Sequence, residues 1–470
     1  MLILSSKYNV FPSHIKVPLL MLILCIPFTF SCKKFVEVDP PATQLESSTV
    51  FTDDKTAIAS ITGIYSSMMQ SASGFASGGQ QSVTVLASLS ADDLVSYNFS
   101  TDIQQFYENS VNSSNSAILA IWGELYSYIY RANAIIEGLS KSNSVTASLR
   151  EQLTEEAKFI RAFSFFYLVN LFGDVPLITS TDYHINQVAS RNSVNEVYEQ
   201  IISDLKETQS LLPDNYSFAG NERVRPTKWA AMALLARVYL YKGDWANAES
   251  LSSSVINNTT LFSLKELDNV FLANSTEAIW QLQPVSPGYN TYEGNLFILN
   301  DIPQFVSLSP ALINVFEEGD LRKAHWVDSI SAPDNTYYYA DKYKIKINDI
   351  VTEYSMVLRL AEQYLLRAEA RAQQDNISGA QEDLNIIRNR AGLGNTTAND
   401  QSSLIAAIIH ERRVELFTEW GHRWLDLKRD GLADNVLSGI KPNWKATDTL
   451  YPLPQSEILS DTHLNQNEGY

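Results

Sequence analysis

Cysteine and histidine are scarce in this sequence, which has two cysteines and six histidines in 470 residues. A fold stapled by disulfides needs more cysteines, and a zinc site needs clustered cysteines and histidines. The histidines show no metal-ligand spacing. The composition therefore excludes a disulfide scaffold, and we expect neither a metal site nor a cofactor. Both cysteines, Cys25 and Cys32, lie near the start of the chain, and the sequence after residue 32 contains no cysteine.

Basic tracts and long apolar runs are missing as well. Lys and Arg number 35 against 53 Asp and Glu, which gives a formal net charge of −18. Such a surface is repelled by phosphate backbones, so we expect no nucleic-acid partner. After Ser31, no apolar run approaches the length of a membrane span. Apolar residues make up 45% of the chain and aromatic residues 11%. These fractions exclude a disordered, collagen-like or coiled-coil chain.

Familiar catalytic motifs are also absent. The sequence has no Gly-rich phosphate loop, no Gly-x-Ser-x-Gly elbow and no Asp-rich calcium loop. His410-Glu411 lacks the second histidine of a zinc-protease helix. Glu411, Glu415 and Glu419 share one helical face, where Arg423 can pair with Glu419. We interpret this segment as a structural ion-pair helix. A catalytic carboxylate pair remains the alternative, because glycoside hydrolysis needs only two suitably placed acids.

The N-terminal part of the chain has the pattern of a leader followed by a linker. Lys7 and Lys16 precede a short apolar run, 17–30, which ends at Ser31-Cys32. We predict a lipoprotein signal peptide over 1–31, lipid attachment at Cys32, and an extended polar tether over 32–50. Thr29 stands where a lipobox usually has an aliphatic residue, and an ordinary signal peptide is the alternative. Removing Lys7 and Lys16 with the leader changes the net charge to −20.

The remainder, 51–470, has the pattern of a single, mainly α domain. Apolar spacing predicts helices over 118–139, 159–172, 226–241, 245–255, 353–373, 379–391 and 401–429. Small residues on either side of Gly243-Asp244 have the offsets of a tetratricopeptide helix pair. An insertion over about 256–352 carries turn signals and alternating runs at 278–282 and 343–347, which predict short strands.

Two stretches mix aromatic with amide and acidic side chains in predicted loops. Sugar rings stack their C–H faces on aromatic rings while their hydroxyls pair with polar groups. We therefore predict ligand contacts in both stretches, although ordinary packing is the alternative for any one of these residues. The candidates are Asp93, Tyr97, Asn98 and Tyr107 in the first stretch, and Trp280, Tyr289, Asn290 and Tyr292 in the second. A further run, Tyr337–Tyr339, fits a strand pair equally well.

Five long blocks, in order, resemble the SusD/RagB family of outer-membrane nutrient-uptake lipoproteins. They are residues 159–177 (FIRAFSFFYLVNLFGDVPL), 225–245, 358–370, 384–393 and 411–429, and the leader and the ending at 451–470 also fit. The resemblance implies tetratricopeptide-like helix pairs, with loops and small strands of the insertion forming the ligand face. In the family these blocks form the scaffold, so the resemblance assigns no ligand-contacting residue to this chain.

The resemblance also implies a function. It suggests a non-catalytic lipoprotein on the surface of the outer membrane of a Bacteroidetes-type bacterium. Such a protein captures a nutrient, most often an oligosaccharide, and delivers it to a SusC-like TonB-dependent barrel. A peptide ligand, a surface glycosidase and a helical scaffold that binds no ligand are the alternatives. Structural calcium is not readable from the sequence.

Overall fold

The computed structural model describes residues 50–470. The predicted leader, Cys32 and nearly all of the tether lie outside the described residues. The longer helices are α2 (Asp54–Met68), α3 (Val83–Ser90), α4 (Thr101–Glu108), α5 (Ser116–Lys141), α6 (Ala147–Phe172), α8 (Val194–Leu211), α9 (Lys228–Lys242), α10 (Trp245–Ile256), α14 (Leu360–Gln373), α15 (Ile377–Arg390), α16 (Gln401–Leu416) and α17 (His422–Arg429). Short helices are α7 (Tyr183–Asn186), α11 (Tyr292–Phe297), α12 (Pro310–Ile313), α13 (Leu321–Trp326), α18 (Ala433–Leu437) and α19 (Gln455–Ser460).

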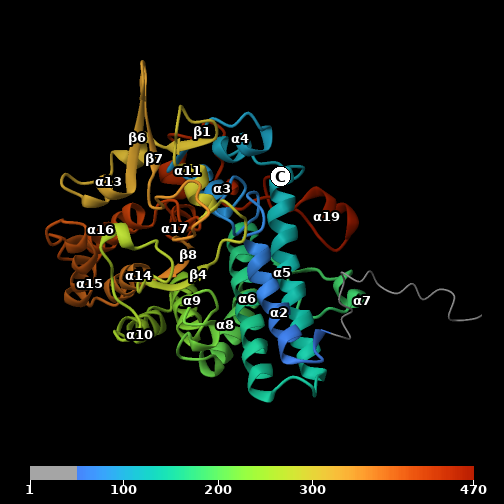
Figure 1. Cartoon of the computed structure of the whole chain (residues 1–470). Coiled ribbons are helices and arrows are strands. Elements are labelled where there is room, and N and C mark those ends of the chain that lie inside the picture. The colour runs from blue at the N-terminus through green and yellow to red at the C-terminus, as the bar shows by residue number, and fades with distance from the viewer. Residues whose placement is uncertain (1–49) are drawn as a thin grey trace, which may run out of the picture. The chain divides into compact units, whose positions relative to one another are not determined.

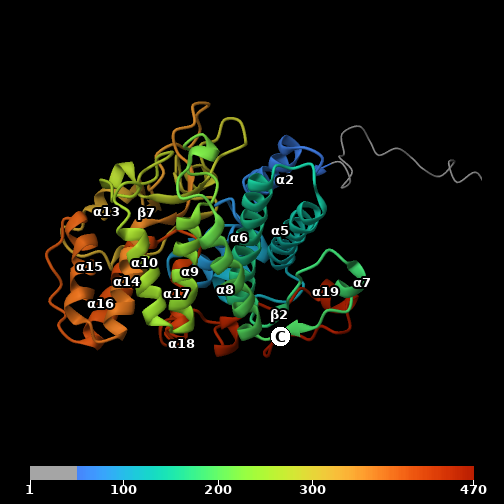
Figure 2. The ribbon, with the colours of Figure 1, turned by 90° about the horizontal axis from the view of Figure 1, so that it is seen from below.

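The long helices stand in a row. Contacts run from α5 to α6, α8, α9, α10, α14 and α15 in turn, and α16 packs on α14 and α15. Figure 2 shows this row, with α5 and α6 at one end and α15 and α16 at the other. The fold is mainly α, as the sequence predicts, and its helix pairs are tetratricopeptide-like. Because α10 packs directly on α14, the row continues across the insertion that separates these helices in sequence.

The helix α6 forms the centre of the core. Every residue from Phe159 to Val169 is buried, because α5 and α8 cover it on both sides. Arg161 is buried as well, and its guanidinium donates to both carboxylate oxygens of Asp204 at 2.7 and 2.8 Å. The helix ends at Phe172 and is capped by Gly173, whose φ of 75° suits a residue without Cβ. The predicted buried helix is confirmed.

The strands form small antiparallel pairs within residues 50–470. They are β1 (Leu94–Ser96) with β5 (Val306–Leu308), β2 (Val175–Pro176) with β3 (Arg191–Asn192), β4 (Ala278–Leu282) with β8 (Ser355–Arg359), and β6 (Val327–Ala332) with β7 (Asn335–Ala340). The predicted strand at 278–282 is confirmed as β4, and Tyr337–Tyr339 lies in β7. The predicted strand at 343–347 is wrong. There the side chain of Glu353 accepts hydrogen bonds from the backbone N–H groups of Lys344 and Ile345, which a strand partner would otherwise take.

The predicted continuous helix over 401–429 is also wrong, because the chain breaks between α16 and α17. Thr418, Trp420 and Gly421 all have positive φ, at 53°, 45° and 72°. The break turns Trp420 into the core, where its Nε1 donates to the Met356 carbonyl at 2.7 Å. Arg423 consequently pairs with Asp92 and not with Glu419.

Both the backbone conformation and the lack of space for a side chain require glycine at position 421. A Cβ there would lie 2.7 Å from the Cβ of Ala87, on a backbone that disfavours side chains. We expect Gly421→Ala to lower the free energy of unfolding by about 2 kcal/mol, measured by urea denaturation. Gly123→Ala, at a helical position with open space around the added Cβ, is the control and should be neutral or stabilising. Equal effects of the two substitutions would contradict this account of the break.

A network of buried charges joins α16 to the insertion and to the α14–α15 pair. Its side chains are almost inaccessible to solvent: Glu277, Arg322, Lys342, Arg359, Arg390, Glu411, Glu415 and Glu419. Arg359 bonds Glu415 at 2.6 Å and Glu419 at 2.7 Å, and Arg390 pairs with Glu415 as well. These cations hold the pKa of the Glu415 carboxyl well below its usual range, although burial alone would raise it. The structural interpretation is confirmed, and Glu411 and Glu415 are closed to any substrate.

Among residues 50–470 no helix has both the length and the apolar character that crossing a bilayer requires.

Candidate functional site

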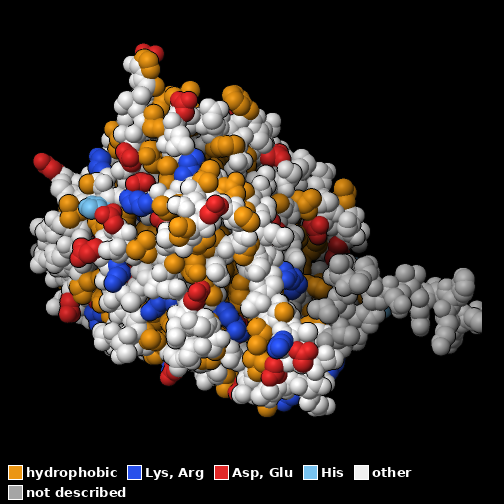
Figure 3. All heavy atoms as spheres, in the orientation of Figure 1, with side chains coloured by type: hydrophobic (Ala, Val, Ile, Leu, Met, Phe, Trp, Pro, Cys, Tyr) orange, Lys and Arg blue, Asp and Glu red, His pale blue; other side chains and the backbone are white. Residues whose placement is uncertain are grey.

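Much of the insertion gathers at one end of the described unit, whereas its strand β4 lies within the core. The β6–β7 hairpin projects from this end, with β1, α4 and α11 nearby (Figure 1). The hairpin packs on β5, which pairs with β1, so the segments near residues 95, 307 and 337 become neighbours. In the view of Figure 3, hydrophobic side chains are exposed at the tip of the hairpin and over the loops beside it. The exposed ring of Phe99 belongs to one of these loops.

A cleft of about 390 Å³ opens where β1, β5 and the hairpin meet, and we call it the tyrosine cleft. Its apolar lining consists of Val95, Leu308, Pro310 and Ile313. Its aromatic and polar lining consists of Tyr97, Ser307, Asn314, Asn335, Thr336, Tyr337 and Tyr338. The volume lies within the range of roughly 300–1,000 Å³ that is usual for small-ligand sites.

Tyr97 and Tyr337 face each other in the cleft. Their ring centroids are 5.7 Å apart, and the planes meet at 81° in an edge-to-face pair. The backbone N–H of Tyr97 donates to the Phe305 carbonyl at 2.7 Å, which continues the β1–β5 pairing to this residue. Its hydroxyl accepts from Ser307 at 3.4 Å. Both rings are half-buried, so each keeps an accessible part for a ligand.

The chemistry of the lining selects an uncharged ligand. Among the described residues that line the cleft, none carries a formal charge. The rings offer flat apolar faces, while the amides of Asn314 and Asn335 and the hydroxyl of Thr336 offer donors and acceptors. A molecule with apolar ring faces and many hydroxyl groups satisfies both kinds of surface. The cleft holds no arrangement of acid and base for catalysis among these residues.

Asp93 is buried behind the lining of the cleft, where it has a structural role and does not reach a ligand. This part of the sequence prediction is wrong. Asp93 is fully buried, and its carboxylate accepts from Arg413 Nε at 3.2 Å. Burial raises the pKa of this carboxyl, and nearby Arg413 counteracts that rise. Its carbonyl accepts from the backbone N–H of Ser309 at 2.8 Å, and Ser309 follows β5 directly. Asp93 therefore ties the strands of the cleft to α16.

Tyr107 and Asn98 lie beside the tyrosine cleft without lining it. Tyr107 lines an adjacent hollow of about 420 Å³ that shares Val95 and Pro310 with the cleft. The ammonium group of Lys441 sits 4.5 Å from the centre of the Tyr107 ring and already occupies one face of it. The side chain of Asn98 accepts from the backbone N–H of Ser100 and shapes the turn before α4. Ligand contact at these two residues stays a prediction.

Trp280 is a core residue, and its predicted role at a ligand site is wrong. Its relative exposure is 0%, and its ring is enclosed by Tyr65, Phe159 and Phe163 at centroid distances of 6.2, 5.1 and 5.3 Å. Its Nε1 donates to the Val224 carbonyl at 3.4 Å. The alternation along β4 suggests one buried and one open face, but α9 and the core enclose the strand completely.

The rest of the second stretch is largely structural. Asn290 is fully buried, which contradicts its predicted ligand role. Its Oδ1 accepts from the N–H groups of Thr352 and Glu353 at 2.6 and 3.1 Å. Tyr292 is mostly buried, and its hydroxyl bonds Ser286 at 2.6 Å. Tyr289 packs on Tyr292 with centroids 5.4 Å apart and remains half-buried, so ligand contact at Tyr289 stays a prediction.

Glu293, next to Tyr292, makes stability depend on pH. Burial raises the pKa of this carboxyl from 4.5 to about 7. Between pH 4.5 and about 7 the folded chain therefore keeps a proton on Glu293 that the unfolded chain has already lost. The contribution of Glu293 to the free energy of unfolding falls as pH rises through this range. The comparison is the free energy of unfolding of Glu293→Gln minus that of the parent chain. We expect this difference to shift in favour of the variant by about 1–2 kcal/mol between pH 5 and pH 7.5. Denaturation at both pH values measures this, and a difference that does not change with pH would contradict it.

Sequence reasoning misses the most important partner of Tyr97. The run that contains Tyr337 is equally compatible with ligand contact and with a strand pair, and nothing in the sequence singles out Asn314 or Asn335. The available signal is three consecutive tyrosines in an alternating strand, which must present rings on both faces. No spacing in the sequence shows that this hairpin packs on β5, or that β5 pairs with the distant β1.

Within residues 50–470, no group of three or more His, Cys, Asp or Glu side chains is arranged to hold a metal ion.

The row of helix pairs and the cleft at one end define the class: a helical scaffold whose loops and short strands form a cleft. Comparison with known proteins makes this more specific. A family model described as starch-binding and associating with the outer membrane matches residues 34–240, and a SusD family model matches 326–470. The chain belongs to the SusD/RagB family.

Known relatives cover most of the chain. A SusD-like protein of Formosa agariphila is 28% identical over 77% of this chain and 82% of its own length. The starch-binding protein SusD of Bacteroides thetaiotaomicron is 24% identical over 71% of this chain and 75% of its own. The solved structure of a laminarin-binding SusD-like protein has a TM-score of 0.75 and 26% identity. The match covers 89% of this chain and 100% of that one.

Proposed function

We propose that this protein binds a neutral glycan in the tyrosine cleft without cleaving it. The observation that carries the proposal is the uncharged cleft in which Tyr97 and Tyr337 present ring surface among amide and hydroxyl groups. The starch-binding and laminarin-binding relatives support the same class of ligand. A glycosidase that uses Glu411 and Glu415 is disfavoured, because both acids are buried in ion pairs.

The proposal extends to transport. The protein acts as a lipoprotein attached through Cys32 at the outer membrane, exposed on the cell surface, and delivers its ligand to a SusC-like TonB-dependent barrel. The description of the matching family as outer-membrane associated supports this location. Mass spectrometry of the mature N-terminus tests the anchor: lipidated Cys32 is expected, and an unmodified cysteine or cleavage elsewhere contradicts it. Co-purification with a barrel tests the partner.

The glycan itself is tested with the chain from residue 33 onward, by affinity electrophoresis and calorimetry. The panel contains neutral polysaccharides such as starch and laminarin, together with peptides. Binding to at least one neutral glycan, without release of reducing ends, is expected. Binding to peptides alone contradicts the glycan assignment. Co-purification with a barrel in the absence of any ligand affinity favours the assembly scaffold.

A further inference from the structure

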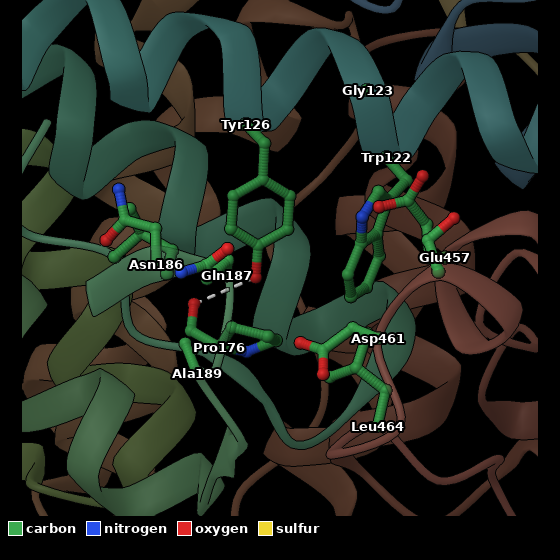
Figure 4. A pocket seen from close by; sticks show the side chains of 12 residues that line it. Trp122, Gly123, Tyr126, Pro176, Asn186, Gln187, Ala189, Glu457, Asp461 and Leu464 are labelled. Carbon is green, nitrogen blue, oxygen red and sulfur yellow. Dashed lines mark hydrogen bonds between the residues drawn. The ribbon is translucent and has the colours of Figure 1, made fainter. Parts of the chain in front are cut away.

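A second hollow lies between α5, α7 and α19 and shares no lining residue with the tyrosine cleft. It has a volume of about 390 Å³, and we call it the indole pocket. Its main side chains are Trp122, Tyr126, Gln187, Glu457 and Asp461, which Figure 4 shows around a common opening. Figures 1 and 2 both place α7 and α19 together, at the opposite side of the unit from α13 and the hairpin.

The aromatic wall of the indole pocket is fixed before any ligand arrives. The rings of Trp122 and Tyr126 are one helical turn apart on α5, with centroids 4.9 Å apart and planes at 49°. Trp122 is held from behind by Phe172, whose ring meets it edge-on at 5.2 Å. The Tyr126 hydroxyl donates to the Pro176 carbonyl at 2.8 Å, as the dashed line in Figure 4 shows. Such preorganised ring surface costs little entropy when a ligand binds.

The polar groups of the pocket, in contrast, have hydrogen-bonding capacity to spare. Within residues 50–470, the Gln187 amide, the Glu457 carboxylate and the Trp122 Nε1 have no hydrogen-bond partner. Asp461 uses Oδ1 for His463 and leaves Oδ2 free. Donors and acceptors that the fold does not use therefore surround an apolar wall, which is the combination that ring-shaped polyols require.

The charge of the pocket narrows the ligand class. Glu457 and Asp461 contribute two carboxylates, and no lysine or arginine is found among its described lining residues. The nearby Arg191 already donates to the carbonyls of Asp174 and Asn465 and to the side chain of Asn467. Phosphorylated, sulfated and uronic-acid ligands are therefore repelled.

We propose that the indole pocket is a second saccharide site, which takes one neutral pyranose ring. The ring lies on the accessible part of Tyr126, with only the edge of the largely buried Trp122 beside it, and its hydroxyls donate to Glu457 and Asp461 and pair with Gln187. This inference rests on the glycan chemistry of the proposed function, but not on the tyrosine cleft itself. Two sites on one chain hold separate parts of a polysaccharide, which raises the overall affinity through effective concentration.

The test uses a cleft-disabled chain, Tyr97→Ala with Tyr337→Ala, so that only the second site is measured. Saturation-transfer NMR is run with glucose, mannose, galactose and xylose, with glucuronate and an apolar tripeptide as comparison probes. At least one neutral sugar should give ring-proton signals, and adding Gln187→Ala with Glu457→Ala should weaken its binding roughly tenfold. Gln455→Ala, an exposed position on α19 outside the pocket, is the matched control and should change nothing.

Four results would overturn the inference: no signal from any neutral sugar, equal binding of glucuronate, a signal that survives Gln187→Ala with Glu457→Ala, or binding of the tripeptide alone. Failure of the proposed function looks different. In that case the unaltered chain binds no glycan, or substitutions in the tyrosine cleft leave glycan affinity unchanged, whatever the pocket variants do.

Discussion

Replacing Arg359 with methionine is expected to lower the free energy of unfolding by about 3–5 kcal/mol. Its guanidinium lies at the centre of the buried network, where it bonds Glu277, Glu415 and Glu419 at 3.1, 2.6 and 2.7 Å. Without this guanidinium, the negative charges of the buried carboxylates are no longer neutralised, and water does not reach them to solvate them. The arginine is also the last residue of β8 and the N-cap of α14, so the loss spreads to the insertion and to the helix row.

Urea denaturation of the parent chain and of Arg359→Met measures this effect. Lys242→Ala is the matched control, because its ion-pair partner Glu199 is largely exposed and the pair should contribute no more than about 1 kcal/mol. A loss at Arg359 as small as the loss at Lys242 would show that the network is not needed for stability. The variant should also bind no glycan at temperatures where it is unfolded.

The second large effect concerns binding. Tyr97→Ala and Tyr337→Ala are each expected to weaken glycan affinity about 10–100-fold, because aromatic anchors dominate such sites. Both rings are half-buried at the surface of the cleft, so their removal should leave the fold intact. Calorimetry with the glycan identified from the panel measures the change.

Tyr130→Ala is the control for these variants, since Tyr130 is an exposed tyrosine on the surface of α5 that lines neither the cleft nor the indole pocket. Its substitution should leave affinity unchanged. Unchanged affinity in Tyr97→Ala and Tyr337→Ala, with all variants folded, would remove the tyrosine cleft from the account.

The helices could be predicted from sequence because their signal is local. The apolar spacing of α5, the all-round apolar character of α6 and the Gly-Asp turn between α9 and α10 each lie within one short segment. The break at Thr418–Gly421 could not be predicted in this way. There, packing of Trp420 into the core competes with the helical pattern, and tertiary contacts decide the outcome.

The site was harder to predict because it depends on pairings between distant segments. The neighbours of Tyr97 in sequence are enough to indicate it, whereas Tyr337 reaches it only through the packing of the hairpin on β5. Trp280 and Asn290 have the composition of a ligand-binding loop, but burial gives them structural roles. Composition alone does not distinguish a ring that stacks on a sugar from a ring that stacks on Phe159.

A crystal structure of the protein with its glycan tests the central claim most directly. We predict a sugar ring in the tyrosine cleft, in van der Waals contact with Tyr97 or Tyr337 and hydrogen-bonded to Asn314 or Asn335. A glycan bound elsewhere on the chain, with the tyrosine cleft empty at saturating ligand, would contradict the account.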